Sequence, residues 1–387
     1  MRVNINKSII ILIIIFIFSS LTACDFVNEK ILDELSIILA MSFDSNPEND
    51  NDDYNPLLLT TSNPLFAEEA KEPVRVKTVQ GRTIGNALDN WQQHRNRLMA
   101  LGKVNIMLFG ENITKENFPN TVKDIRQIPE IDATSLVAYH PGKAKNLLYQ
   151  NPVEDGRIAV FLSDMLEFGA DDGLIPEVTL HELWTAVLTK GRDGYLPKVD
   201  LKEEGDEIPY ISGAMVLTEN GNKATTLNSE ETKLLTTMLN EKAIPSFSSN
   251  IFVEEEEGLI EYSVQNTDMN INVEYNNEVS VEIDNNIEVY LEEVQIPGIE
   301  IIDKKTFETI AEFVAKDFMD NTQNLIAKLQ RHKSDPIGIG QYVRIQQSEY
   351  YSKGTWRNDY PDIDIDNNYT VNVFRGSTLS ETFKLER

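Results

Sequence analysis

The one cysteine of the chain, Cys24, follows Leu21-Thr22-Ala23 directly after an apolar segment. This setting is typical of a bacterial lipoprotein signal, in which the thiolate is alkylated by a diacylglyceryl group. The peptide bond before the cysteine is then cut, so the mature chain begins with the lipidated residue. We therefore predict that Cys24 is a lipidation site, that residues 1–23 are a signal peptide, and that the mature protein is tethered outside a cytoplasmic membrane.

The segment before Cys24 has the parts that such a signal needs. Arg2 and Lys7 provide a positive start, and residues 9–18 form an unbroken apolar run. A secretory apolar region spans about 7–15 residues, whereas a membrane-spanning helix needs about 20. The alternative, an uncleaved anchor with Cys24 as an ordinary small residue, fits this length less well. One acyl chain holds a protein only marginally, but two chains make a durable tether.

Other residues that could do chemistry lack their partners. His181-Glu182 resembles the start of a zinc-protease helix, but Thr185 stands where the second histidine is required. The motif at Gly338-Ile339-Gly340 lacks the third glycine of a dinucleotide-binding turn. Paired carboxylates are so frequent in this chain that they indicate nothing specific. We therefore predict no catalytic residues, no metal site and no cofactor.

The composition limits the classes of partner. The chain has 63 acidic and 35 basic residues, and its net charge is −28. A body of this charge repels phosphate backbones and anionic headgroups, so we predict no nucleic-acid partner. The hydrophobic share of 41% is that of a folded protein, and the length of 387 residues suggests two or three domains.

The first half of the chain alternates strands with helices, which is typical of an α/β or α+β domain. We expect a long-looped hairpin within residues 36–62. A helix over residues 83–101 would begin at Thr83 and stop at Gly102. A buried strand over residues 104–109, a helix over residues 114–127 and a strand over residues 136–139 follow.

The second half contains an acidic antiparallel meander. Residues 251–294 alternate with a period of two, and we place turns at Asn276-Asn277 and Asn285-Asn286. Before the meander, Ser229 is predicted to cap a helix over residues 230–241. After it, residues 306–332 predict a long amphipathic helix. We expect the apolar stripe along one face of this helix to pack in the core; a surface that binds a partner protein is the alternative. Strands over residues 363–365 and 369–373 end the pattern.

Several sequence blocks occur in the order of one known family. They are ELSIILAMSFD (34–44), RLMALGKVNIMLFGENITKENF (97–118), PEVTLHELWTAVLTKGRDGYLPKV (176–199), ISGAMVL (211–217), LNSEETKLLTTML (227–239), the Asp335-Pro336-Ile337-Gly338-Ile339-Gly340 segment, Trp356 and YPDIDID (360–366). In these blocks the chain resembles the Ger(x)C family of spore germination proteins, the C subunits of nutrient germinant receptors. It departs from the family pattern at Asp25-Phe26, Leu39, Met41 and Lys103.

The resemblance implies an α+β protein of three mixed α/β domains, with antiparallel sheets in the middle and C-terminal parts and the long amphipathic helix in the last. The expected limits are residues 24–205, 206–300 and 301–387. The resemblance also implies a non-enzymatic lipoprotein on the outer side of the spore inner membrane, assembled with membrane-spanning A and B subunits. Asp335, Gly338, Gly340 and Trp356 are family-motif positions. We expect them to shape a turn and fill a core; direct contact with a partner is the alternative.

Two other classes of protein remain open from the residues. A solute-binding lipoprotein of a transporter would have two similar α/β lobes around a ligand cleft. A tethered hydrolase would need a catalytic motif, and the sequence contains no recognisable one.

Overall fold

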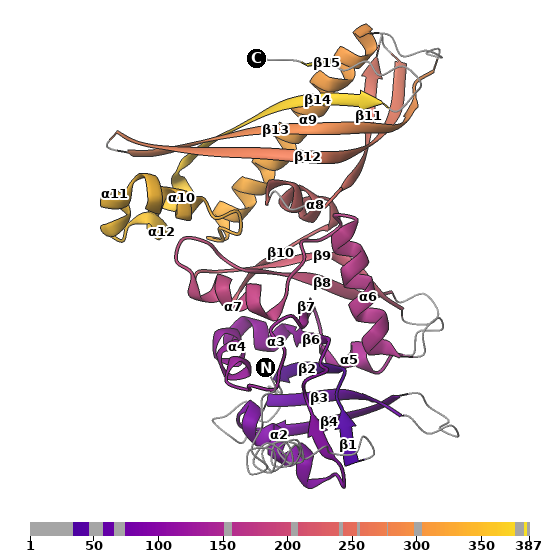
Figure 1. Cartoon of the computed structure of the whole chain (residues 1–387). Helices are drawn as coiled ribbons and strands as arrows, with labels where there is room; N and C mark the ends of the chain where they lie inside the picture. Colours follow the sequence, from indigo (N-terminus) through magenta and orange to yellow (C-terminus); the bar gives the residue numbers. More distant parts are fainter. Residues whose placement is uncertain are drawn as a thin grey trace, which may run out of the picture.

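The computed structural model describes residues 34–45, 57–65, 74–150, 157–202, 208–239, 243–253, 256–276, 278–297, 304–375 and 383–384. The predicted signal peptide and Cys24 lie outside these residues. Within them, no helix has both the length and the apolar character needed to cross a membrane. The described part is elongated, with one large sheet towards one end and a second, longer-stranded sheet at the other (Figure 1).

The first sheet has eight strands of mixed direction. In spatial order they are β10 (Lys223–Leu227), β9 (Ile208–Leu217), β8 (Tyr195–Lys202), β7 (Leu136–His140), β6 (Ile106–Gly110), β2 (Ala40–Ser45), β3 (Leu57–Pro64) and β4 (Val74–Gly81). Strands β2, β6 and β7 are parallel, and every residue of β6 and β7 is buried. Continuous apolar strands of this kind belong in the middle of a sheet that is covered on both faces. The predicted hairpin within residues 36–62 is confirmed by the antiparallel pairing of β2 with β3.

Helices cover both faces of this sheet. Apolar residues of α2 (Ile84–Gln93), α4 (Phe118–Arg126) and α7 (Leu180–Leu188) share one buried cluster with Phe43 and Phe109. Those of α5 (Lys145–Leu148) and α6 (Ile158–Asp171) share the cluster on the other face with Ile106 and Leu108. The α+β class predicted from the sequence is therefore confirmed.

Two helix predictions in this half need correction. Thr83 caps α2, as expected, by accepting from the backbone N–H of Asn86, but the helix ends at Gln93. Residues 98–100 instead form β5 (Leu98–Ala100), which pairs in parallel with β1 (Leu35–Ile37), so Gly102 is not the helix stop. Strand pairing has overridden the helical pattern there. The helix predicted over residues 114–127 is split into α3 (Glu111–Glu116) and α4, because Pro119 has no N–H to continue the hydrogen bonds of α3.

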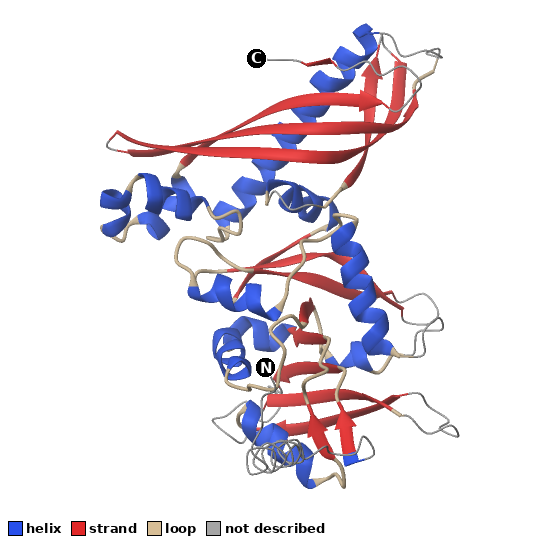
Figure 2. Ribbon diagram, viewed as in Figure 1, coloured by secondary structure: helices blue, strands red, loops and turns tan. Residues whose placement is uncertain are grey.

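The second sheet has the order β11 (Ser246–Val253), β12 (Glu256–Asn276), β13 (Glu278–Gln295), β14 (Asp364–Arg375) and β15 (Phe383–Lys384). Strands β11, β12 and β13 form the predicted antiparallel meander, and β14 joins β13 in parallel. The long helix α9 (Lys304–Arg331) crosses one face of this sheet (Figure 2). Every residue of its predicted stripe is buried, from Phe307 to Leu329, so the core interpretation of that stripe is confirmed.

The turn predicted at Asn285-Asn286 is wrong, because both residues lie inside β13. Odd positions from Val279 to Leu291 all face the core, and Asn285 is the one polar residue among them. Its amide donates to the Asn367 side-chain oxygen at 2.8 Å and to the Asn368 carbonyl at 3.0 Å. Those partners belong to β14, which runs unbroken through the gap expected between residues 365 and 369. Long-range pairing thus satisfies an asparagine that looks like a turn residue.

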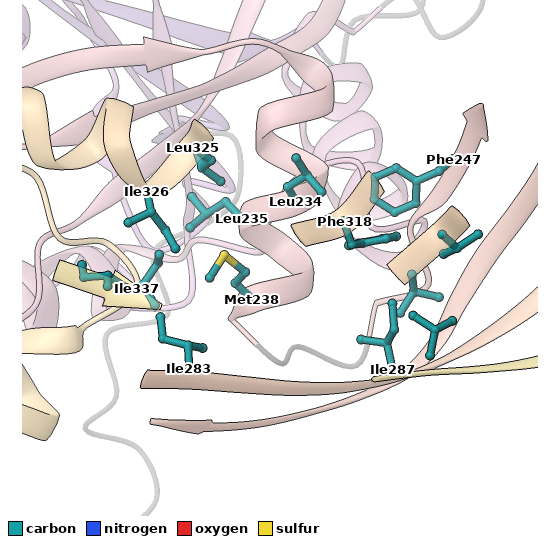
Figure 3. Close-up of a cluster of buried hydrophobic side chains, with 14 of the residues drawn as sticks. Leu234, Leu235, Met238, Phe247, Ile283, Ile287, Phe318, Leu325, Ile326 and Ile337 are labelled. Atoms are coloured by element: carbon teal, nitrogen blue, oxygen red, sulfur yellow. The ribbon is translucent and has the colours of Figure 1, made fainter. Parts of the chain in front are cut away.

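Helix α8 (Ser229–Met238) lies between the two sheets (Figure 1). Its cap is Asn228 and not Ser229, because Asn228 accepts from the N–H of Glu231 while Glu231 accepts from the N–H of Asn228. This reciprocal pair is a capping box. Leu234, Leu235 and Met238 of α8 pack against residues of β13 and α9 (Figure 3). Val216 and Leu227 of the first sheet belong to the same buried cluster, so an apolar core is continuous between the two sheets.

The expected domain limits fall between paired strands. The limit at 205/206 separates β8 from β9, which are antiparallel neighbours, and the limit at 300/301 separates β13 from β14. The three-domain limits stay a prediction, but segments on either side of each limit share one sheet. Past α9, the chain forms α10 (Ile339–Gln346), α11 (Ser348–Ser352) and α12 (Trp356–Asp359) before a 3-10 turn (Tyr360–Asp362) leads into β14.

Candidate functional site

Asp335 is the centre of the turn that follows α9. Its carboxylate is fully buried and accepts three backbone hydrogen bonds. Oδ1 accepts from Gly338 at 2.9 Å and from Ile339 at 3.0 Å, and Oδ2 accepts from Gly340 at 2.7 Å. A carboxylate with several N–H donors replaces the water that burial removes, so Asp335 fixes the path of the chain into α10.

The two motif glycines meet different requirements. Gly338 has a φ of +85°, a left-handed conformation that side chains other than glycine rarely adopt. Gly340 is needed for space, because a Cβ there would lie 2.4 Å from Nε1 of Trp356 and 2.9 Å from the carbonyl oxygen of Gly191. Gly191 has a φ of +87°, and a Cβ at this position would clash with the backbone of Gly340. The backbones of Gly191 and Gly340 and the indole ring of Trp356 therefore pack so closely that a side chain at either glycine would not fit.

The loop between α7 and β8 brings a second carboxylate to Asp335. The N–H of Asp193 donates to the carbonyl of Asp335 at 2.8 Å, and the N–H of Asp335 donates to Oδ2 of Asp193 at 2.7 Å. Arg357 of α12 then holds both oxygens of Asp193, each at 2.7 Å. This arrangement joins the loop of Asp193 to two segments that lie 142 and 164 residues further along the chain. We call Gly191, Asp193, Asp335, Gly338, Gly340, Trp356 and Arg357 the joint.

Burial dominates the electrostatics of the joint. It raises the pKa of Asp335 to about 6, and the Asp193 carboxylate adds to the rise, against the backbone donors and Arg357. Burial likewise raises the pKa of Asp193, although its hydrogen bonds with Arg357 oppose the shift. Two buried carboxylates thus lie beside the half-buried Arg357, which forms its ion pair with Asp193.

A second chain of contacts runs beside the ion pair. Trp356 is 2% exposed and packs on Tyr360 with ring centroids 5.3 Å apart. The hydroxyl of Tyr360 donates to the carbonyl of Ser334 at 3.0 Å, and the hydroxyl of Ser334 donates to the carbonyl of Leu217 in β9 at 2.6 Å. The turn after α9 is therefore bonded to both the first sheet and the α12 region.

The structure brings together the four motif positions predicted from the sequence, Asp335, Gly338, Gly340 and Trp356. The sequence reasoning missed Gly191, Asp193 and Arg357 as their partners. Gly191 and Asp193 lie within the family block at residues 176–199, and Arg357 directly follows the motif tryptophan. Their positions in or next to the family blocks marked these residues as candidates. The sequence could not show that they contact Asp335, because the contact joins segments more than 140 residues apart. The predicted lipidation site, Cys24, lies outside the described residues.

The joint is suited to holding segments together. The Asp335 oxygens accept three hydrogen bonds from the turn that contains Asp335, and Asp193 is paired with Arg357.

The His181-Glu182 pair has a structural role, because Glu182 belongs to the capping box of α7 with Thr179. Across the described residues, no group of three or more histidine, cysteine, aspartate or glutamate side chains is placed to hold a metal ion.

A second polar cluster joins the parallel strands to the edge of the first sheet. The Lys223 ammonium of β10 donates to Glu111 Oε1 at 2.9 Å, to Glu111 Oε2 at 2.7 Å and to the hydroxyl of Tyr139 at 2.7 Å. The Tyr139 hydroxyl also donates to Glu111. Burial alone would raise the pKa of Glu111, but the bonds from Lys115, Lys223 and Tyr139 outweigh it and lower the value to about 2.

Comparisons with known proteins agree with this architecture. The chain matches the model of the spore germination protein N-terminal domain over residues 28–201. It matches the spore germination B3/GerAC-like C-terminal model over residues 212–376. Among curated proteins, the spore germination protein GerQC of Bacillus cereus is 20% identical over 189 residues, which is 49% of this chain and 51% of the relative. The chain thus matches about half the length of that relative.

A solved structure shows the same fold. The crystal structure of the GerBC protein superposes with a TM-score of 0.56 at 15% identity, and the match covers 87% of this chain and 98% of that one. The joint takes residues from both matched regions, since Asp193 lies in the first and Asp335 in the second. With these two models matched over most of its length, the chain belongs to the Ger(x)C family of spore germination proteins.

Proposed function

We propose that this protein is the non-enzymatic C subunit of a spore nutrient germinant receptor, tethered by a diacylglyceryl group on Cys24 to the outer face of the spore inner membrane. It would act there with membrane-spanning A and B subunits. The observation that carries the proposal is the pair of family matches, which lie in sequence over residues 28–201 and 212–376. The name of the relative GerQC, a spore germination protein, points to the same process.

The proposed tether rests on the sequence. The only cysteine of the chain follows a small-residue cleavage motif and an apolar run of secretory length. A net charge of −28 repels anionic headgroups, so attachment needs the lipid or a protein partner. Two acyl chains would keep the protein at high effective concentration beside membrane-spanning partners.

The joint supports a role as a stiff body between partners. It connects the two family-matched regions through buried polar contacts, and the apolar core is continuous between the sheets. The alternative of a solute-binding lipoprotein calls for two similar α/β lobes. The described part instead has a mixed eight-stranded sheet and a five-stranded sheet with a long hairpin, which favours the receptor subunit.

The proposal is tested by isolating a tagged form from detergent-solubilised spore membranes and identifying its partners by mass spectrometry. We expect membrane-spanning A and B subunits to copurify, and Cys24→Ala to reduce membrane retention, copurification and germination. Transporter components, or no partner from membranes in which the protein is abundant, would refute the receptor role.

A matched rescue separates the tether from other effects of the cysteine. Residues 1–24 are replaced by an uncleaved membrane-spanning helix that leaves the body on the outer face. If tethering is what Cys24 supplies, this form restores germination without lipid. Normal retention and normal germination in Cys24→Ala would count against the tether.

A further inference from the structure

A cavity of about 480 Å³ lies away from the joint, between helices α8 and α9 and strands β11 and β12. Its walls include Glu230, Ser249, Tyr262, Asp317 and Phe318. All of its lining residues belong to the described part of the chain. A volume of roughly 300–1,000 Å³ is usual for sites that bind small molecules.

One side of the cavity carries a carboxylate without a positive partner. Asp317 accepts from the hydroxyl of Ser249 at 3.3 Å and from the amide of Asn321 at 2.9 Å. No lysine or arginine of the described residues forms an ion pair with it. Burial raises its pKa, and the nearby charges of Asp320 and Glu230 add to the rise. The Asp317 carboxylate thus lacks the compensating charge that a partly buried anion requires.

The lysines around the cavity are already engaged. Lys233 pairs with Glu230 at 2.8 Å, and Lys328 pairs with Glu231 at 2.7 Å. With Asp317 included, three carboxylates at the cavity face two ammonium groups. The cavity therefore has an excess negative charge at Asp317 that a positively charged ligand would neutralise.

Aromatic side chains also line the cavity. Phe247, Phe313, Phe318 and Tyr262 line it, and the Phe247 and Phe318 rings meet edge to face at 5.0 Å. Figure 3 shows these two rings side by side near Leu234. The face of Phe247 already receives the ammonium of Lys233 at 5.1 Å from the ring centroid. Aromatic faces attract cations, so the apolar wall also favours a positive ligand.

Tyr262 places a buried hydroxyl beside Ser249 and Asp317. The residue is fully buried, and burial raises the pKa of its hydroxyl, although hydrogen bonding with Ser249 opposes the rise. Asp317 and Tyr262 are close enough to interact electrostatically.

We propose that this cavity binds a small organic cation, with its primary ammonium group at Asp317 and Ser249 and its apolar body against Phe313 and Phe318. An inorganic calcium ion would need six to eight oxygen ligands, whereas four of the residues that line this cavity are aromatic. The carboxylate sets the charge of the ligand, and the aromatic residues set its shape.

Three probes of one shape and different charge test the proposal: benzylamine, benzyl alcohol and benzoate. Calorimetric titration is carried out with the full-length protein in detergent at pH 7.5. We expect saturable binding of benzylamine, binding of benzyl alcohol weaker by about ten-fold, and none of benzoate, since a charge-assisted bond contributes about 1.5–3 kcal/mol. Benzoate binding as strong as benzylamine binding, or no saturable benzylamine binding, would overturn the proposal.

Matched variants on one helix place the site. Asp317→Asn should weaken benzylamine binding by about ten-fold or more, and Asp320→Asn, which removes the same charge from an exposed position, should change it by less than about two-fold. If Asp317→Asn does not fold, Phe313→Leu, at a half-buried ring of the cavity, should weaken benzylamine more than benzyl alcohol. Equal effects of the two asparagine variants, or binding of calcium alone, would contradict the assignment.

Discussion

Arg357 and Asp193 are 164 residues apart in the chain and form a two-pronged ion pair with both nitrogen–oxygen distances at 2.7 Å. The planar guanidinium matches the carboxylate, so the contact fixes orientation as well as distance. The same Asp193 carboxylate accepts from the N–H of Asp335. The ion pair therefore links the loop before β8, the turn after α9 and helix α12 at one point.

Replacing Arg357 tests how far the joint depends on its single cation. Arg357→Ala leaves the buried Asp193 carboxylate without its ion-pair partner, and we expect a loss of about 3–5 kcal/mol in the free energy of unfolding. Arg357→Lys keeps the positive charge but cannot form the two-pronged ion pair, so its loss in the free energy of unfolding should be smaller. Urea unfolding measures both, with Arg344→Ala on the exposed face of α10 as the control. A loss for Arg357→Ala as small as that of the control would show that the pair adds little.

Gly340→Ala tests the close packing of the joint. The added methyl group would lie 2.4 Å from Trp356 Nε1 and 2.9 Å from the carbonyl of Gly191, so the two segments must separate. We expect a loss of about 1–3 kcal/mol, as for overpacked cores. Gly85→Ala is the matched control, because its methyl group would have no neighbour closer than 4.0 Å and lies in helix α2. The control should be neutral or slightly stabilising by thermal melting.

The raised pKa of Asp335 predicts a pH dependence of stability. Because the folded-state value is about 6 and the unfolded value is 3.8, the folded state binds the proton more tightly. The contribution of this carboxyl is complete below about pH 4 and is lost as the pH rises through 6. The difference in unfolding free energy between the native protein and Asp335→Asn should shrink from pH 4 to pH 7. Urea unfolding at several pH values measures it, and a difference that grows over this range would contradict the prediction.

Glu111 predicts the opposite trend. Its folded-state pKa of about 2 lies below the usual 4.5, so its contribution is present above pH 4.5 and is lost as the pH falls towards 2. Glu111→Gln should cost about 1–3 kcal/mol at pH 7, as expected when a charged hydrogen bond is removed, and progressively less in acid. A double-mutant cycle with Lys223→Met isolates the pair, and additive losses would show that the two side chains do not interact.

Local pattern was enough to predict much of the fold. The period of two over residues 251–294, the stripe of α9 and the cap at Thr83 each depend on neighbours in sequence, and each is present in the structure. Errors occurred where distant segments decide the local form. Residues 98–100 pair with β1 and leave the helical pattern, and Asn285 stays inside a strand because Asn367 of β14 accepts from its amide.

The sequence by itself determined the family, the α+β class and the positions of the motif residues, because these follow from residue order and periodicity. Only the tertiary structure showed that Gly340 must be small for the sake of Trp356 and Gly191, and that Asp193 and Arg357 complete the site of Asp335. The physical reason is that burial and charge pairing depend on which distant segments meet. A carboxylate with no predicted partner looks the same in sequence whether it lies in solvent or at the centre of a buried joint.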